Sequence, residues 1–191
     1  MEKLTVKDAV AFIPNAQNGN GVSVTTMSNG GKYKVRKKIF YIAGLAAELG
    51  SEGQLIEQKT NKEVGITNFD GGNKLNKGRN LLVIGVRMLF DTTASVAVKT
   101  ATWLSATPAN FKNGELVISQ DGTGNLFENP IGPFSKYNAS IATEDEFQTV
   151  VPFLIREDVT FKIQALLAGA AAADQAYRLE LECIEFVEAD K

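Results

Sequence analysis

The feature that most constrains the fold of this chain is a succession of strand-like segments separated by turn sequences, which begins near residue 64. The segments are rich in β-branched and aromatic residues, and several alternate apolar with polar side chains. The clearest one spans 115–120, because Asn-Gly precedes it and Asp-Gly follows it, and both dipeptides are typical of tight hairpin turns. The segments are 64–69, 80–90, 95–104, 115–120, 148–155, 159–167 and 176–187.

These segments, together with shorter ones at 22–26 and 32–41, amount to about eight strands. They follow one another too closely for the crossover helices that a parallel sheet requires. We therefore predict a mainly β fold, in which two antiparallel sheets pack as a sandwich.

The chain divides into an arm and a domain. Residues 1–31 are rich in asparagine and glycine and are assigned to an N-terminal arm or extended segment, and 32–191 to the sandwich domain. One or two short helices are expected, the main one over 43–58 in two pieces that are broken between Gly50 and Gly53.

The absence of histidine excludes several chemistries, because histidine is the commonest metal ligand and titrates nearest neutrality. Ser-His-Asp and Cys-His nucleophile systems and the usual zinc sites therefore cannot be built. No glycine-rich run matches a phosphate-binding loop. The single cysteine, Cys183, can form no disulfide within the chain. We expect neither a cofactor nor a metal ion.

Paired carboxylates are the catalytic chemistry that remains, and Glu180, Glu182 and Glu185 are the candidates. They belong to 176–187, where polar residues alternate with apolar ones, which is typical of a solvated sheet face rather than a cleft. We therefore predict that the chain is not an enzyme and that no small-molecule ligand binds it.

The charge pattern argues against a general affinity for nucleic acid, since acids and bases are interleaved and the net charge is −2. Only 32–38 is locally basic, with Arg36, Lys37 and Lys38 in succession. This stretch is either the solvated face of a strand or a positive patch that meets an acidic neighbour or nucleic acid.

No apolar run approaches the roughly 20 residues of a membrane helix, so no membrane partner is expected. The first residues also lack the apolar core of a signal peptide. We therefore expect synthesis in the cytoplasm.

Two groups of apolar residues are candidates for an interaction surface. Phe12 and Ile13 lie in the arm, which has too few apolar residues to fold alone but could become ordered on a neighbouring molecule. Phe127, Ile131 and Phe134 lie near a proline-bearing loop. They either contact other copies of the chain or cover the open end of the sandwich.

Three stretches, 76–83, 111–118 and 129–134, resemble the sequences of bacteriophage structural proteins. With the arm and the antiparallel strands, the pattern over 64–187 resembles a jelly roll, the fold of many capsid and virion proteins. The resemblance implies a virion protein that self-assembles symmetrically, with arms that reach neighbouring subunits. Its partners would be other copies of itself and other virion proteins.

Jelly rolls also occur in lectins, and a carbohydrate-binding or adhesion module is the alternative function. That reading requires a shallow groove that holds Trp103, Tyr137 and nearby carboxylates. Such a groove would distinguish the two hypotheses.

Overall fold

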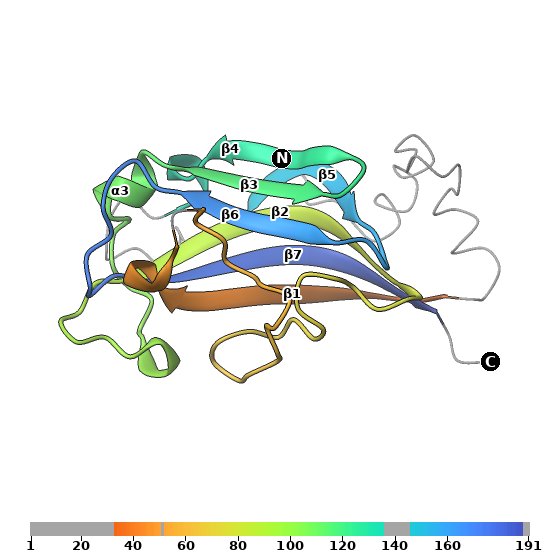
Figure 1. Ribbon diagram of the computed structural model, residues 1–191, viewed down its shortest axis with the longest axis horizontal. Helices are drawn as coiled ribbons and strands as arrows, with labels where there is room; N and C mark the ends of the chain where they lie inside the picture. The colour runs from red at the N-terminus through yellow and green to blue at the C-terminus, as the bar shows by residue number, and fades with distance from the viewer. Residues whose placement is uncertain (1–32, 51, 136–145, 189–191) are drawn as a thin grey trace.

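The computed structural model describes residues 33–50, 52–135 and 146–188, and these fold as a β-sandwich (Figure 1). The four-stranded sheet has the order β1-β7-β2-β5 and the three-stranded sheet the order β4-β3-β6, and adjacent strands within both sheets are antiparallel. The strands are β1 Tyr33–Leu45, β2 Arg79–Asp91, β3 Glu115–Gln120, β4 Gly124–Pro130, β5 Gln148–Ile155, β6 Phe161–Leu166 and β7 Ala176–Glu188. The predicted antiparallel sandwich is confirmed.

Helical structure in the described residues is limited to short turns. The α-helix α3 covers Ala109–Lys112, and the 3₁₀ turns are η2 Ala46–Glu48, η3 Val98–Thr100 and η4 Gly132–Phe134. Within these described ranges, no helix has the length and apolar character that crossing a bilayer requires. The arm assigned to 1–31 and the strand expected at 22–26 lie outside the described residues.

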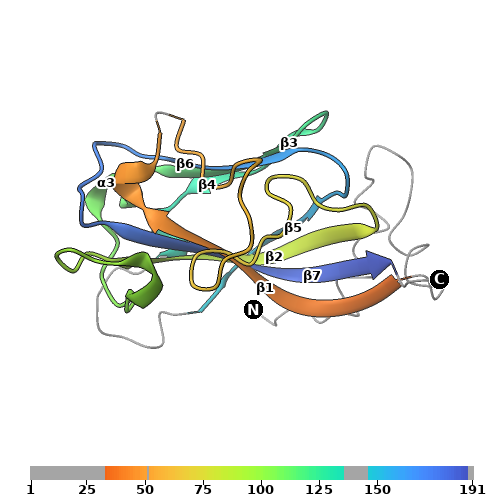
Figure 2. The same ribbon diagram turned by 60° about the horizontal axis from the view of Figure 1, so that its bottom comes forward.

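The two sheets form two layers that face each other (Figure 2), and aromatic side chains are prominent in the core between them. Phe69 comes from the long connection between β1 and β2, and its ring lies 5.2 Å from that of Phe40 and 5.9 Å from that of Phe161. The connection therefore contributes to the core as the strands do. A second aromatic chain consists of Phe90, Phe111 and Tyr177.

Strand β2 lies inside the four-stranded sheet and is buried on both faces. Leu81 and Val83 join the core between the sheets, whereas Leu82 and Ile84 belong to a separate apolar cluster with Phe186. This double burial explains why 80–90 is a nearly unbroken apolar run rather than an alternating one. The strand predicted there is confirmed.

The strands pair in a nested way along the sequence. The first strand, β1, pairs with the last, β7; β2 pairs with β5; and β3 pairs with β4. A fourth pair is formed by 53–55 and β6, where the Leu55 amide donates to Ile163 and the Ala165 amide donates to Gly53, both at 2.8 Å. Along the sequence, the β1–β7 pair encloses the pair of 53–55 with β6. That pair encloses β2–β5, which in turn encloses β3–β4.

Three predicted elements are wrong in the described residues. The helix over 43–58 is replaced by the end of β1, by η2 and by an extended piece at 53–55, because pairing with β6 outweighs the helical preference. Segment 64–69 forms only isolated bridges, and 95–104 is a loop that contains η3.

The loop that follows β2 is held by the buried carboxylate of Asp91. Oδ1 accepts hydrogen bonds from the Thr93 amide (2.9 Å) and hydroxyl (2.6 Å), and Oδ2 accepts from the Thr102 amide (2.6 Å) and hydroxyl (3.0 Å). Burial alone would raise the pKa of Asp91, but these four bonds lower it from 3.8 to about 2. They tie both ends of the loop to β2, which explains why no strand forms at 95–104.

The Asp91 contribution to stability is expected to depend on pH. Because the folded pKa of about 2 lies below 3.8, the contribution is fully present above pH 3.8 and is lost as the pH falls through 2. Asp91→Asn should therefore cost on the order of 2 kcal/mol at pH 7 and clearly less at pH 2. Urea unfolding of both proteins at the two pH values measures this, and an equal cost at both would contradict the account.

Candidate functional site

A groove of about 430 Å³ opens at one side of the sandwich, between the edge strand of each sheet, β4 and β5. Residues 126–130 and 148–153 form its two walls, and Pro133 and Phe134 complete the lining. Its volume lies within the range of ligand pockets, and most of its lining side chains are apolar. It is the candidate functional site.

An aromatic group forms the base of the groove. The Phe127 ring stacks on that of Phe153 with the ring centres 5.5 Å apart, and it lies 6.1 Å from that of Phe134. These three side chains and that of Ile131 are buried. The structure therefore brings Phe127, Ile131 and Phe134 together as a cover over the open edge of the sandwich, with the groove outside it.

The β5 wall of the groove is exposed and uncharged. Strand β5 has the sequence QTVVPFLI and carries no ionisable side chain. Val151, in the middle of the strand, is 81% exposed, and Gln148 and Thr149 are also exposed. The sequence pattern did not single out these residues as an interaction surface, although an uncharged strand next to the charged stretches 144–146 and 156–158 is a visible signal.

The opposite wall, on β4, is more polar. Glu128 is exposed and accepts a hydrogen bond from the Asn125 side chain at 2.6 Å. Among the described residues, it is the one carboxylate in the lining of the groove.

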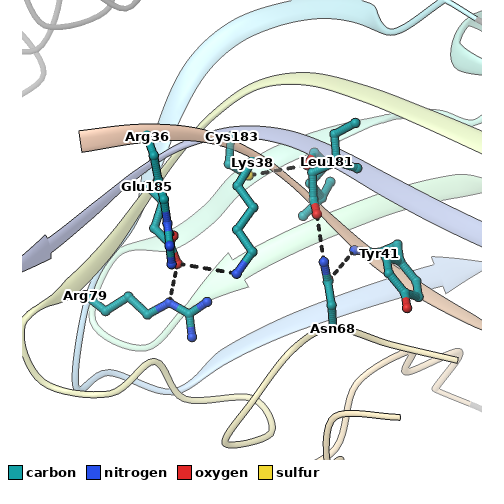
Figure 3. A network of polar contacts seen from close by, with 9 residues as sticks. Arg36, Lys38, Tyr41, Asn68, Arg79, Leu181, Cys183 and Glu185 are labelled. Atoms are coloured by element: carbon teal, nitrogen blue, oxygen red, sulfur yellow. Dashed lines mark hydrogen bonds and ion pairs between the residues drawn. The ribbon is translucent and has the colours of Figure 1, made fainter. Parts of the chain in front are cut away.

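The predicted basic stretch lies at the other edge of the four-stranded sheet and contacts a buried carboxylate (Figure 3). Arg36 donates to Glu185, Arg79 Nε lies 2.7 Å from Glu185 Oε1, and Lys38 Nζ lies 3.9 Å from the same oxygen. Glu185 is fully buried. We call Arg36, Lys38, Arg79 and Glu185 the Glu185 cluster.

Two pKa shifts follow from the Glu185 cluster. Burial alone would raise the pKa of Glu185, but the hydrogen bond from Arg36 and the charges of Arg79 and Lys38 lower it. Burial also lowers the pKa of Lys38, and the neighbouring cations act in the same direction. The cluster is therefore an ionised structural network inside the chain.

The expectation that Glu180 and Glu185 lie on a solvated face is wrong. Glu180 is 4% exposed and bonds to Arg87 and Arg178, each at 2.6 Å. Of the three glutamates, Glu182 is the partly exposed one, and it pairs with Lys37 at 2.5 Å. Alternation indicated which residues were polar, but not that arginines from neighbouring strands and from β7 itself would cover them.

Trp103, one residue of the carbohydrate hypothesis, lies away from the groove. Trp103 lies in the loop after β2, has a positive φ of 59°, and its ring is 6.0 Å from the Arg178 guanidinium. It does not line the groove between β4 and β5. Tyr137, Phe12 and Ile13 lie outside the described residues.

The remaining carboxylates and the thiol of the described residues form no metal-binding cluster. Across the part of the chain that the structure describes, no cluster of three or more cysteine, aspartate and glutamate side chains could hold a metal ion. Cys183 is fully buried in the core, and burial raises the pKa of its thiol. The groove and the Glu185 cluster are therefore the candidate functional features of the described residues.

Comparisons of this chain with models of protein families, with curated proteins and with solved structures found no match.

Proposed function

We propose that this chain is a structural subunit of a virion, a bacteriophage capsid or capsid-associated protein, and that its sandwich is a jelly roll. The observation that carries the proposal is the nested pairing of the strands. Jelly rolls contain about eight strands in two sheets, and viral capsid proteins are prominent among them.

Nested pairing is the expected result when one long antiparallel hairpin rolls up into two sheets. Here the pairs β1–β7 and β2–β5 fall in the four-stranded sheet. The pairs β3–β4 and 53–55 with β6 fall in the three-stranded one. If 53–55 is counted as a short strand, both sheets have four strands. The step from this fold to a virion is an argument by analogy of fold.

A role in assembly rather than catalysis also agrees with the chemistry of the described surfaces. The buried carboxylates Glu180 and Glu185 are each held by two arginines. The groove is apolar on its β5 side, and apolar exposed surface favours contacts between proteins. In the proposal, Phe12 and Ile13 of the arm add contacts to neighbouring subunits, whereas Arg36, Lys37 and Lys38 pair with carboxylates within the chain.

Negative-stain electron microscopy of the purified chain at high concentration tests the proposal. The expected result is closed particles or rings of one size and symmetry. A matched variant that lacks 1–31 should remain folded and form smaller species, which would assign the outer contacts to the arm. Images of the full chain that show only particles of monomer size would contradict the proposal and favour the carbohydrate-binding alternative.

A further inference from the structure

We infer that the Glu185 cluster binds a phosphate group at its open side, with Lys38 and Arg79 as the main donors. The basic stretch 32–38 had two interpretations, a solvated strand face or a positive patch that meets an anionic partner. The inference takes the second one for the face of β1 that carries Arg36 and Lys38. It is independent of self-assembly, because the site lies within one copy of the chain.

The cluster extends the inner face of the four-stranded sheet beyond the hydrophobic core. Because side chains alternate along a strand, Arg36 and Lys38 share a face of β1 with the buried Phe40. In the same way, Arg79 shares a face of β2 with the buried Leu81, and Phe40 and Leu81 both belong to the core between the sheets. The side chains of Arg36, Lys38 and Arg79 are 61%, 31% and 14% exposed. The cluster is therefore open to solvent on one side.

One carboxylate serves three cations in this cluster. Lys38 Nζ and Arg79 Nε lie 3.9 and 2.7 Å from the same oxygen of Glu185, and Arg36 donates to the other oxygen. Among the described residues, no second carboxylate lies within ion-pair distance of these three cations. The cluster therefore carries two positive charges in excess.

The ring of Phe40 holds two of these cations side by side. Lys38 Nζ lies 4.6 Å from the ring centre, and the guanidinium carbon of Arg79 lies 5.1 Å from it. Cation–π contacts position a cation without neutralising it. Burial lowers the pKa of Lys38, and the charges of Arg79, Arg36 and Lys62 lower it further. A bound anion would relieve this repulsion.

The donors fit a phosphate group. Arg79 bonds to Glu185 through Nε, and its two terminal nitrogens extend away from that carboxylate (Figure 3). A guanidinium can donate through two nitrogens at once to phosphate oxygens, and a lysine binds phosphate as a point charge. A free phosphate or a phosphate monoester carries about two negative charges at neutral pH, which matches the excess of the cluster.

The sequence alone predicted no such ligand. The excess charge arises only when β1, β2 and β7 pair, because this pairing places Arg36, Lys38 and Arg79 around one glutamate. In the sequence, acids and bases are interleaved and nearly balance. A dianionic phosphate is favoured over the backbone of a nucleic acid, since each phosphodiester carries one charge.

Calorimetric titration with inorganic phosphate at neutral pH and low ionic strength tests the site. The unchanged chain should bind phosphate, and Lys38→Gln should bind it about tenfold more weakly, because one charge-assisted hydrogen bond is lost. Arg36→Gln should also weaken binding, and its exposed position makes a loss of folding unlikely to interfere. Circular dichroism checks that each variant is folded.

Lys37→Gln is the matched control. Lys37 lies between Arg36 and Lys38 in β1 and its side chain is 50% exposed, but it pairs with Glu182 on the other face of the sheet. This variant loses the same charge from the same strand and should bind phosphate as the unchanged chain does.

Three results would overturn the inference. The first is the absence of phosphate binding by the unchanged chain. The second is equal affinity of Lys37→Gln and the two folded variants Lys38→Gln and Arg36→Gln, which would reduce the effect to net charge. The third is a DNA oligonucleotide without terminal phosphates that displaces phosphate from the unchanged chain, whereas phenyl phosphate does not. That result would replace the dianion by a nucleic-acid backbone.

Discussion

Replacing Glu185 by alanine is expected to lower the free energy of unfolding by about 3 kcal/mol, because removal of one partner from a buried ion pair leaves the other charges unpaired. The Glu185 side chain is fully buried, and that of its partner Arg79 is only 14% exposed. Arg36, Lys38 and Arg79 would then repel one another without a carboxylate between them. Urea unfolding followed by circular dichroism measures the change.

Glu63→Ala is the matched control, because it removes a glutamate from an ion pair with Lys99 in which both side chains are more than half exposed. Such a pair contributes less than about 1 kcal/mol. Glu185→Gln keeps the shape and loses the charge, so its cost should lie between the two. If Glu185→Ala cost no more than Glu63→Ala, the Glu185 cluster would not stabilise the fold.

The Glu185 contribution should also decline in acid. The folded pKa of Glu185 lies below its ordinary value of 4.5, so the contribution is present above that pH and is lost as the pH falls through the folded pKa. The difference between the unchanged chain and Glu185→Gln should therefore shrink in acid.

Gly53→Ala is expected to cost about 3 kcal/mol or more, since it affects the pair between 53–55 and β6. A Cβ at Gly53 would lie 2.1 Å from the backbone oxygen of Ala165, and Gly53 has a φ of +60°. The strand would have to move away from β6, and the hydrogen bonds of Gly53 and Leu55 would be lost.

Gly122→Ala separates the steric effect from the backbone effect. Gly122 has a φ of +76°, but a Cβ there would meet nothing within 4 Å, so only the left-handed conformation is penalised, by about 1 kcal/mol. Thermal or urea unfolding of the two variants gives the comparison. Equal costs would mean that the close approach of Gly53 to β6 does not constrain the sandwich.

Much of the sandwich could be predicted from the sequence, because local patterns specify most of its strands. The strand at 115–120 is flanked by turn dipeptides, and 176–187 alternates over its whole length. In contrast, 43–58 has helix-forming residues, but its residues 53–55 pair with β6, more than one hundred residues away. Such long-range pairing leaves no local signal.

The candidate site could be predicted only in part for the same reason. Phe127, Ile131 and Phe134 were identified as apolar residues near a loop, but the stacking of Phe127 on Phe153 of β5 depends on how two edge strands meet. The burial of Glu185 depends on Arg36 and Arg79 from two other strands. Periodicity within one strand identifies polar positions, but it does not show which side chains of other strands lie over them.

The mass of the purified chain in solution, measured by light scattering over a wide range of concentrations, tests the central claim of self-assembly most directly. If the chain self-assembles, the mass rises with concentration to a defined multiple of 20.6 kDa. A constant mass of one chain at every concentration would contradict it.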